Sequence, residues 1–222
     1  MKLGIISAME SEINYILETS QVVNQIKLKK AIFYQCEIGD VELVVVASGV
    51  GKTNATMYTQ VLIDYFDPTA IINIGIGGGL SDKLRPLDLI LGTTFSHHDV
   101  SIEQMEALKP FTSTFEADGE LVKLFDAYEG VKIRGHIASG ESFIASETDR
   151  KQIIEMHKPL LVDMETSSMA HCCYLNDKPF ISLRSVSDLA NDEADESYEE
   201  NEIAAADAAG KALLDVLGKI SL

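Results

Sequence analysis

The sequence is poor in cysteine, with three in 222 residues. They are Cys36, Cys172 and Cys173, an odd number without a Cys-x-x-Cys pair. Disulfide frameworks and zinc sites typically show paired spacings, whereas isolated buried cysteines pack as small hydrophobic residues. We therefore expect reduced thiols, with neither disulfides nor a bound metal.

Basic residues are also scarce: 18 Lys and Arg stand against 35 Asp and Glu, a formal net charge of −17. Such a surface repels phosphate backbones and anionic lipid headgroups, so nucleic acids and membranes are poor partners. The first apolar run reaches a carboxylate by Glu10, which makes it too short for a signal peptide or a membrane span. A cytoplasmic location is the expectation that follows.

What the chain does contain is ordinary for a globular protein, with 46% hydrophobic and 24% charged residues. This length suits one domain, and we expect residues 1–222 to form it. Apolar runs rich in Ile and Val predict strands, and several are continuous, as in strands covered on both faces. The predicted strands are Leu3–Ser7, Val41–Ala47, Ala70–Ile74, Leu87–Leu91, Lys132–Ala138 and Phe180–Val186.

Helical periodicity between these strands predicts an α/β fold, a central mixed twisted sheet flanked by helices. Phe33–Glu37, followed by Gly39-Asp40 and the next strand, is typical of a hairpin, so the sheet is not purely parallel. The acidic stretch 191–202 leads into an Ala-rich amphipathic helix that ends near Gly218. The other predicted helices are Thr53–Tyr65, Gly119–Tyr128 and Thr166–Leu175.

Two glycine-rich segments follow strands without matching a nucleotide-binding motif. Gly49-Val50-Gly51-Lys52-Thr53 ends like a phosphate-binding loop, but that motif requires a glycine where this chain has Val46. Gly75-Ile76-Gly77-Gly78-Gly79 lacks the last glycine of a dinucleotide fingerprint, because position 80 is Leu80. Neither an ATPase nor a nicotinamide enzyme is expected. Both segments would let a ligand approach the backbone closely, although tight turns alone explain them equally well.

Three carboxylates stand at predicted strand ends: Glu12, Glu165 and Asp188. In open α/β sheets the carboxyl ends of strands meet at one crevice, so we expect the three to share a pocket. Each alone also has a structural explanation, because Glu12 and Glu165 would favour the first turn of a helix and Asp188 could cap one. Their coincidence at three strand ends favours a functional site.

A set of short stretches runs along almost the whole chain. They are Gly4-Ile5-Ile6, Ala8-Met9-Glu10 with Glu12, Ser48-Gly49-Val50-Gly51-Lys52, Ile71-Ile72-Asn73 with Gly75, Gly78-Gly79-Leu80, His98-Asp99, Ser139-Gly140 with Phe143-Ile144, Met164-Glu165, and Arg184 with Ser187-Asp188. In this order and spacing the chain resembles the 5'-methylthioadenosine/S-adenosylhomocysteine nucleosidases of the nucleoside phosphorylase superfamily. The resemblance implies a nucleoside phosphorylase-like fold, a site without cofactor or metal, and a homodimer in which a neighbouring chain completes the pocket for the 5' substituent.

The resemblance further implies hydrolysis of the N-glycosidic bond of an adenine thionucleoside, as in methionine salvage and nucleoside catabolism. Cleavage builds positive charge on the ribose and negative charge on the departing adenine, so one ionised acid must activate water and one protonated acid must protonate the base. By resemblance Glu12 is the base and Asp188 donates to adenine N7. Because an ordinary Asp, with a pKa of about 3.9, is ionised at neutral pH, burial must favour the neutral form of Asp188.

Further substrate contacts follow from the same resemblance. Glu165 accepts hydrogen bonds from the ribose hydroxyls and, when ionised, stabilises developing positive charge, while Arg184 positions the pocket carboxylates. Phe143 stacks on adenine, although taken alone it would be assigned to the core. Ser187 orients Asp188. The remaining implied substrate-binding residues are Met9, Val50, Ile76, Gly77, Ile144, Met164 and Tyr198.

The presence or absence of arginine distinguishes phosphate from water as the nucleophile, because a guanidinium group binds two phosphate oxygens at once. The chain has no Arg before Arg85, and it carries Asn73 where related phosphorylases carry an Arg. Water is therefore the expected nucleophile, and Lys52 is interpreted as structural.

Three departures from the family concern the rest of the pocket. Ile76 stands where the family usually has a Ser, Tyr198 stands where it has a Phe, and residues 100–106 replace an aromatic and Gly-rich segment. They leave the 5' substituent open, with methylthioadenosine ranked first and S-adenosylhomocysteine second. Three other functions also stay open: hydrolysis of another adenine nucleoside such as aminofutalosine or adenosine, purine nucleoside phosphorolysis, and noncatalytic nucleoside binding.

Overall fold

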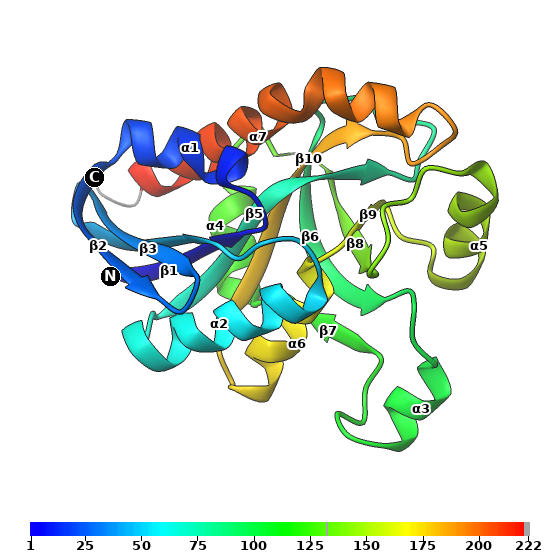
Figure 1. The fold of residues 1–222 in the computed structure, drawn as a ribbon, viewed down its shortest axis with the longest axis horizontal. Helices are drawn as coiled ribbons and strands as arrows, with labels where there is room; N and C mark the ends of the chain where they lie inside the picture. The colour runs from blue at the N-terminus through cyan, green and yellow to red at the C-terminus, as the bar shows by residue number, and fades with distance from the viewer. Residues whose placement is uncertain (132, 220–222) are drawn as a thin grey trace.

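The computed structural model describes residues 1–131 and 133–219. Within them ten strands form one sheet, with helices on both sides of it (Figure 1). The strands are β1 (Lys2–Ser7), β2 (Gln21–Leu28), β3 (Ala31–Ile38), β4 (Val41–Ala47), β5 (Ala70–Gly79), β6 (Leu89–His97), β7 (Thr114–Glu116), β8 (Ile133–Ser139), β9 (Leu161–Asp163) and β10 (Phe180–Asp188). The helices are α1 (Glu10–Thr19), α2 (Lys52–Phe66), α3 (Ile102–Ala107), α4 (Gly119–Asp126), α5 (Glu147–His157), α6 (Thr166–Leu175) and α7 (Ala194–Gly218).

The sheet is mixed, and part of it closes into a ring. β5 pairs with β10 along one side and with β9 at its carboxyl end, and the pairings of β9 with β8, β8 with β6 and β6 with β10 complete the ring. On the other side of β5 the sheet continues through β1 and β4 in parallel and through β3 and β2 in antiparallel pairing. The predicted fold class, a single-domain α/β fold with a mixed sheet flanked by helices, is confirmed.

Alternate residues of the central strands enter two separate hydrophobic cores. In β1, Ile5 shares a core with Leu213 of α7, whereas the next residue, Ile6, shares a core with Leu62 of α2 and Met169 of α6. Figure 1 shows α1 and α7 along one side of the sheet and α2 and α6 along the other. Because β1 is buried on both faces, its apolar run is continuous rather than alternating.

The predicted elements with long apolar or periodic runs lie where the sequence places them. β4 and α6 have the predicted bounds, and β3 and β4 form the predicted hairpin around Gly39-Asp40. The start of the strand predicted at Leu87–Leu91 is wrong: Leu87 has a left-handed φ of 72°, and β6 begins at Leu89. The first residue of the predicted strand Lys132–Ala138 lies outside the described residues.

Six elements have no clear signal in the sequence: α1, β2, α3, β7, α5 and β9. β2 is exposed along most of its length, so it needs no apolar run, and β7 and β9 have three residues each. Short or exposed segments of this kind form because longer neighbours offer them backbone partners.

The topology brings several strand ends to one edge of the sheet. β1 and β10 run parallel to β5 on its two sides, and β9 pairs with the last residues of β5 through Gly78 and Gly79. The residues that follow β1, β9 and β10 therefore surround the carboxyl end of β5. Among the helices of residues 1–131 and 133–219, none has the length and apolar character required to cross a bilayer.

Candidate active site

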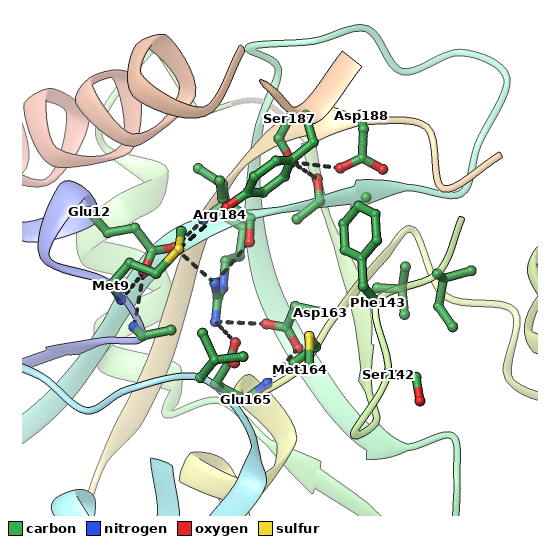
Figure 2. A pocket seen from close by; sticks show the side chains of 18 of the residues that line it. Met9, Glu12, Ser142, Phe143, Asp163, Met164, Glu165, Arg184, Ser187 and Asp188 are labelled. Atoms are coloured by element: carbon green, nitrogen blue, oxygen red, sulfur yellow. Dashed lines mark hydrogen bonds and ion pairs between the residues drawn. The ribbon is translucent and has the colours of Figure 1, made fainter. Parts of the chain in front are cut away.

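A cavity of about 320 Å³ lies at this edge of the sheet, a size suited to a small organic ligand (Figure 2). All thirteen site residues predicted from the sequence line it, including the three strand-end carboxylates Glu12, Glu165 and Asp188. The other ten are Met9, Val50, Ile76, Gly77, Phe143, Ile144, Met164, Arg184, Ser187 and Tyr198. Six further residues complete the lining: Ala8, Gly78, Ser142, Val162, Asp163 and Asp195.

Glu12 lies in the first turn of α1, and its carboxylate is almost fully buried. Oε2 accepts hydrogen bonds from the backbone N–H groups of Ala8 and Met9, each at 2.9 Å, and Oε1 accepts one from Ile76 at 2.9 Å. Two of these N–H donors come from the residues just before α1 and the third from β5, so the protein backbone fixes the position of the carboxylate. A carboxylate has about four acceptor positions, so Oε1 keeps one for a further donor.

Asp188 ends β10 on another wall of the cavity (Figure 2). Its Oδ2 accepts a hydrogen bond from the Ser187 hydroxyl at 2.8 Å, and its Oδ1 accepts one from the Ala190 N–H at 2.8 Å. Burial raises the pKa of Asp188, and the hydrogen bonds from Ser187 and Ala190 oppose that rise in part. The direction agrees with the protonated Asp188 expected from the sequence, and Ser187 contacts the carboxyl as expected.

Arg184 lies in the middle of β10 with 1% of its surface exposed. Its Nη2 lies 2.7 Å from Oδ2 of Asp163 and donates to the Thr166 hydroxyl at 2.8 Å, and its Nη1 donates to the Ile76 carbonyl at 2.9 Å. A buried guanidinium is stable only when paired and hydrogen-bonded, and this one has an ion pair with Asp163 and hydrogen bonds from all three of its nitrogens.

Glu165 follows β9, immediately before α6. Its Oε1 accepts a hydrogen bond from the backbone N–H of Gly51 at 2.8 Å, and Gly51 holds a left-handed φ of 95°. Burial, then the Asp163 charge, raises the pKa of Glu165 to about 7, against the lowering effect of Arg184. Near neutral pH, Glu165 is thus partly protonated, whereas the charge stabilisation expected from the sequence requires its ionised form.

Apolar side chains form the remaining wall. The rings of Phe143 and Tyr198 meet edge to face at 5.6 Å, and the Tyr198 hydroxyl lies 3.4 Å from the Met9 sulfur. Phe143 is 43% exposed, so it is not a core aromatic. The Ile76 side chain is buried against Met9, Tyr198 and two alanines of α7, which makes that part of the wall apolar, as its replacement of a Ser implies.

Asp163 is the main polar residue of the cavity that was not predicted from the sequence. Its signal was indirect: Arg184 lies inside a predicted buried strand, and a buried guanidinium requires a buried carboxylate partner. Asp163 stands two residues before Glu165 at the end of a three-residue strand, where an acid could equally well begin a helix.

The charges of the cavity are mostly negative. Among its lining residues within the described chain, Arg184 is the one cation, and it is engaged by Asp163. Lys52, at the start of α2, pairs with Asp99 and does not line the cavity. No free guanidinium or ammonium among the described lining residues is therefore available to hold a phosphate ion.

Comparisons with known proteins agree with this architecture. A family model described as the phosphorylase superfamily matches residues 2–219. The chain is 34% identical over 208 residues to a 5'-methylthioadenosine/S-adenosylhomocysteine nucleosidase of Staphylococcus haemolyticus, over 89% of this chain and 91% of that protein. The nucleosidase from Neisseria meningitidis, solved in complex with methylthio-immucillin-A, superposes with a TM-score of 0.91 at 29% identity, over 98% of this chain and 99% of that one.

A solved futalosine hydrolase of Helicobacter pylori superposes equally well, with a TM-score of 0.92 at 27% identity over 99% of this chain and 98% of that one. The resemblance inferred from the short sequence stretches is confirmed. By the match over residues 2–219 and the identity to the staphylococcal protein, the chain belongs to the phosphorylase superfamily and, within it, to the 5'-methylthioadenosine/S-adenosylhomocysteine nucleosidases.

Proposed function

We propose that the chain hydrolyses the N-glycosidic bond of 5'-methylthioadenosine and S-adenosylhomocysteine, releasing adenine and the 5-thioribose product. The observation that carries the proposal is the placement of Glu12 and Asp188 on different walls of one cavity, where backbone N–H groups hydrogen-bond the Glu12 carboxylate and burial raises the pKa of Asp188. The relatives of the chain described above are named for this activity.

In the proposed reaction the bond between the ribose C1' and adenine N9 breaks, and its electron pair goes to the base. Asp188 gives its proton to adenine N7, which neutralises the leaving group. A water molecule attacks C1' and gives a proton to Glu12 through the acceptor position that remains on Oε1. Transfer of one proton from Glu12 back to Asp188 through solvent restores the starting state.

Other residues hold the substrate in this proposal. Glu165 accepts hydrogen bonds from the ribose hydroxyls. When Glu165 is ionised, its negative charge stabilises the ribosyl cation. The exposed Phe143 ring stacks on adenine, and Ile144 reads the purine edge through its backbone. Met9, Met164 and Tyr198 surround the sugar and its thioether with apolar and polarisable atoms.

Water is the proposed nucleophile because the cavity does not offer phosphate a cationic cradle. Phosphate would lie among Glu12, Glu165 and Asp163, and the nearby guanidinium is already paired. Negative charges of the neighbouring carboxylates would raise the free energy of a phosphate ion bound among them.

One alternative substrate is supported by a specific observation, since the futalosine hydrolase shares the fold at a TM-score of 0.92. An aminofutalosine-type nucleoside differs from methylthioadenosine in its 5' group. Ile76 and Tyr198, both departures from the family pattern, line the cavity.

We further propose that residues 1–222 act as one catalytic domain in a cytoplasmic homodimer that serves methionine salvage. α3 and the segment after it project from the body of the fold (Figure 1). Leu108 and Phe111 of this segment are largely exposed. Apolar side chains on a projecting segment suit a second copy of the chain, and sedimentation equilibrium tests this: a monomer at micromolar concentration would refute it.

The function is tested by adenine release from methylthioadenosine, S-adenosylhomocysteine, aminofutalosine and adenosine, each with and without phosphate. The proposal expects the two thionucleosides to have the highest kcat/KM and phosphate to have no effect. Preference for aminofutalosine would favour the alternative, and phosphate-dependent release would identify a phosphorylase. A chain that binds these nucleosides without releasing adenine would be a binding protein.

A further inference from the structure

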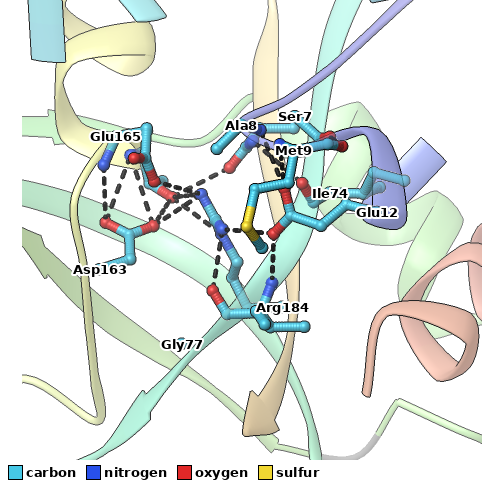
Figure 3. Close-up of polar contacts among 12 residues, drawn as sticks. Ser7, Ala8, Met9, Glu12, Ile74, Gly77, Asp163, Glu165 and Arg184 are labelled. Atoms are coloured by element: carbon cyan, nitrogen blue, oxygen red, sulfur yellow. Dashed lines mark hydrogen bonds and ion pairs between the residues drawn. The ribbon is translucent and has the colours of Figure 1, made fainter. Parts of the chain in front are cut away.

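Arg184 is surrounded by three carboxylates, but it contacts them unequally. Its Nη2 lies 2.7 Å from Asp163, whereas its Nη1 lies 3.7 Å from Glu12 and its Nη2 lies 3.9 Å from Glu165. Figure 3 shows the guanidinium between Asp163 and Glu165 on one side and Glu12 on the other. One carboxylate thus forms the direct ion pair, and the other two stay beyond hydrogen-bond distance.

Asp163 is itself held firmly in place. Its carboxylate accepts hydrogen bonds from the Ser139 and Thr166 hydroxyls and from the backbone N–H groups of Glu165 and Thr166, the last two at 3.3 Å. The residue is 8% exposed. The donors come from β8, from the residue before α6 and from the first turn of α6, so Asp163 is a fixed anchor for Arg184.

Each nitrogen of the guanidinium also makes a hydrogen bond to a neutral group of the protein. Nε and Nη2 both point to the Thr166 hydroxyl, and Nη1 donates to the Ile76 carbonyl. A guanidinium has a rigid planar fork, so once two of its edges are bound it cannot turn toward another acid without losing these contacts.

We propose that Asp163 is a positioning residue, which holds the Arg184 guanidinium away from Glu165 and Glu12 so that both carboxylates remain available to substrate and water. The role in the reaction rests on the proposed function, but the positioning itself does not. Without Asp163, the Nη2 group that it holds would be free to pair with Glu165, which lies 3.9 Å from the same nitrogen, while Nη1 lies 3.7 Å from Glu12.

The same arrangement sets the charge around Glu165. The groups that face it are Asp163 from β9, Arg184 from β10, Glu12 from α1 and the Gly51 N–H just before α2. The Glu165 charge in turn contributes to the raised pKa of Tyr198 of α7. Asp163 and Glu12 raise the pKa of Glu165, and Arg184 and Gly51 lower it. Removing the Asp163 charge therefore acts twice in one direction, because it removes a repulsion and frees a cation.

The first test is a carboxyl ¹³C NMR titration of Glu165, assigned with Glu165→Gln, in the unmodified chain and in Asp163→Asn. The proposal expects Glu165 to titrate about one pH unit lower in Asp163→Asn. Asp118→Ala is the matched control: it removes a carboxylate that caps α4, far from the cavity, and should leave the titration unchanged. An unchanged Glu165 titration in Asp163→Asn overturns the proposal, whether or not the chain proves to be a nucleosidase.

The second test measures the kinetics of adenine release. In Asp163→Asn the acid limb of the kcat/KM profile should move to lower pH with Glu165, and KM should rise about tenfold because Glu165 is tied to Arg184. Asp118→Ala should keep the wild-type profile. If the unmodified chain releases no adenine, the proposed function fails while the titration still decides the positioning role.

A third measurement needs no variant and stands if Asp163→Asn does not fold. The Arg184 side-chain ¹⁵N signals are followed in the unmodified chain from pH 5 to pH 9, across the titration of Glu165 near its pKa of about 7. Because Asp163 holds the guanidinium, these signals should stay nearly constant. Signals that move in step with Glu165 would show the guanidinium turning toward it and would overturn the proposal.

Discussion

Gly75 and Glu12 are packed so closely that a side chain on the glycine has no room. A Cβ atom at Gly75 would lie 2.3 Å from Glu12 Oε1 and 2.4 Å from Arg184 Nη1. The glycine therefore lets two buried charged groups approach the backbone of β5. The sequence is equally consistent with close approach of a ligand and with a tight turn at these glycines, and at Gly75 side chains of the protein itself occupy the space.

This closeness predicts that Gly75→Ala lowers adenine release at least a hundredfold, because the methyl group must displace the proposed base or the guanidinium. The measurement is kcat/KM for methylthioadenosine. Gly119→Ala is the control, since a Cβ at Gly119 meets nothing within 4 Å, and it should retain full activity. Equal activity of the two variants would show that Glu12 does not need its observed position.

The buried carboxylate of Glu165 is expected to destabilise the folded state when it is ionised. Its pKa is about 7 when folded and ordinarily 4.5, so above pH 7 the folded state carries the full cost of a buried charge. As pH falls from 7 to 4.5, the folded state binds the proton before the unfolded state does, and the folded state gains stability. Below 4.5 both states are protonated and no further change follows.

Glu165→Gln should therefore raise the free energy of unfolding at pH 8 by on the order of 3 kcal/mol, and this gain should shrink toward pH 5. Urea denaturation at the two pH values measures it. Glu120→Gln, at an exposed position of α4, should show no such pH-dependent gain. A Glu165→Gln gain that is equal at pH 5 and pH 8 would mean that Glu165 titrates normally.

The ring of Tyr198 is expected to contribute more to substrate binding than its hydroxyl. The ring packs edge to face on Phe143, a contact of roughly 1 kcal/mol. The hydroxyl donates to the Met9 sulfur, a weak acceptor. Tyr198→Phe should change KM for methylthioadenosine less than about twofold, and Tyr198→Ala should raise it about tenfold. A large effect of Tyr198→Phe would assign the hydroxyl a direct role with substrate.

Much of the fold follows from the sequence because buried strands need apolar residues on both faces. β1, β4 and β10 show this pattern, and α6 has the predicted bounds. β2 leaves no such trace, because its stability comes from pairing with β3 rather than from burial.

The site could be predicted only in part from the residues themselves. The convergence of Glu12, Glu165 and Asp188 follows from strand ends meeting at one edge, and the other contacts came from the family resemblance. Asp163 was not predicted from the sequence, because its role depends on the orientation of the Arg184 side chain in the folded structure. Pairings across the fold, such as Phe143 with Tyr198, are set by the tertiary structure and have no local signal.

The most direct test of the proposed acid and base separates the two with a second substrate. A 4-nitrophenyl riboside carrying the same 5' group needs no protonation of its leaving group, whereas adenine does. Asp188→Asn should lose at least about a hundredfold in kcat on methylthioadenosine yet keep most of its activity on the aryl riboside, and Glu12→Gln should lose activity on both. Equal losses of Asp188→Asn on the two substrates would contradict the assignment of Asp188 as the proton donor.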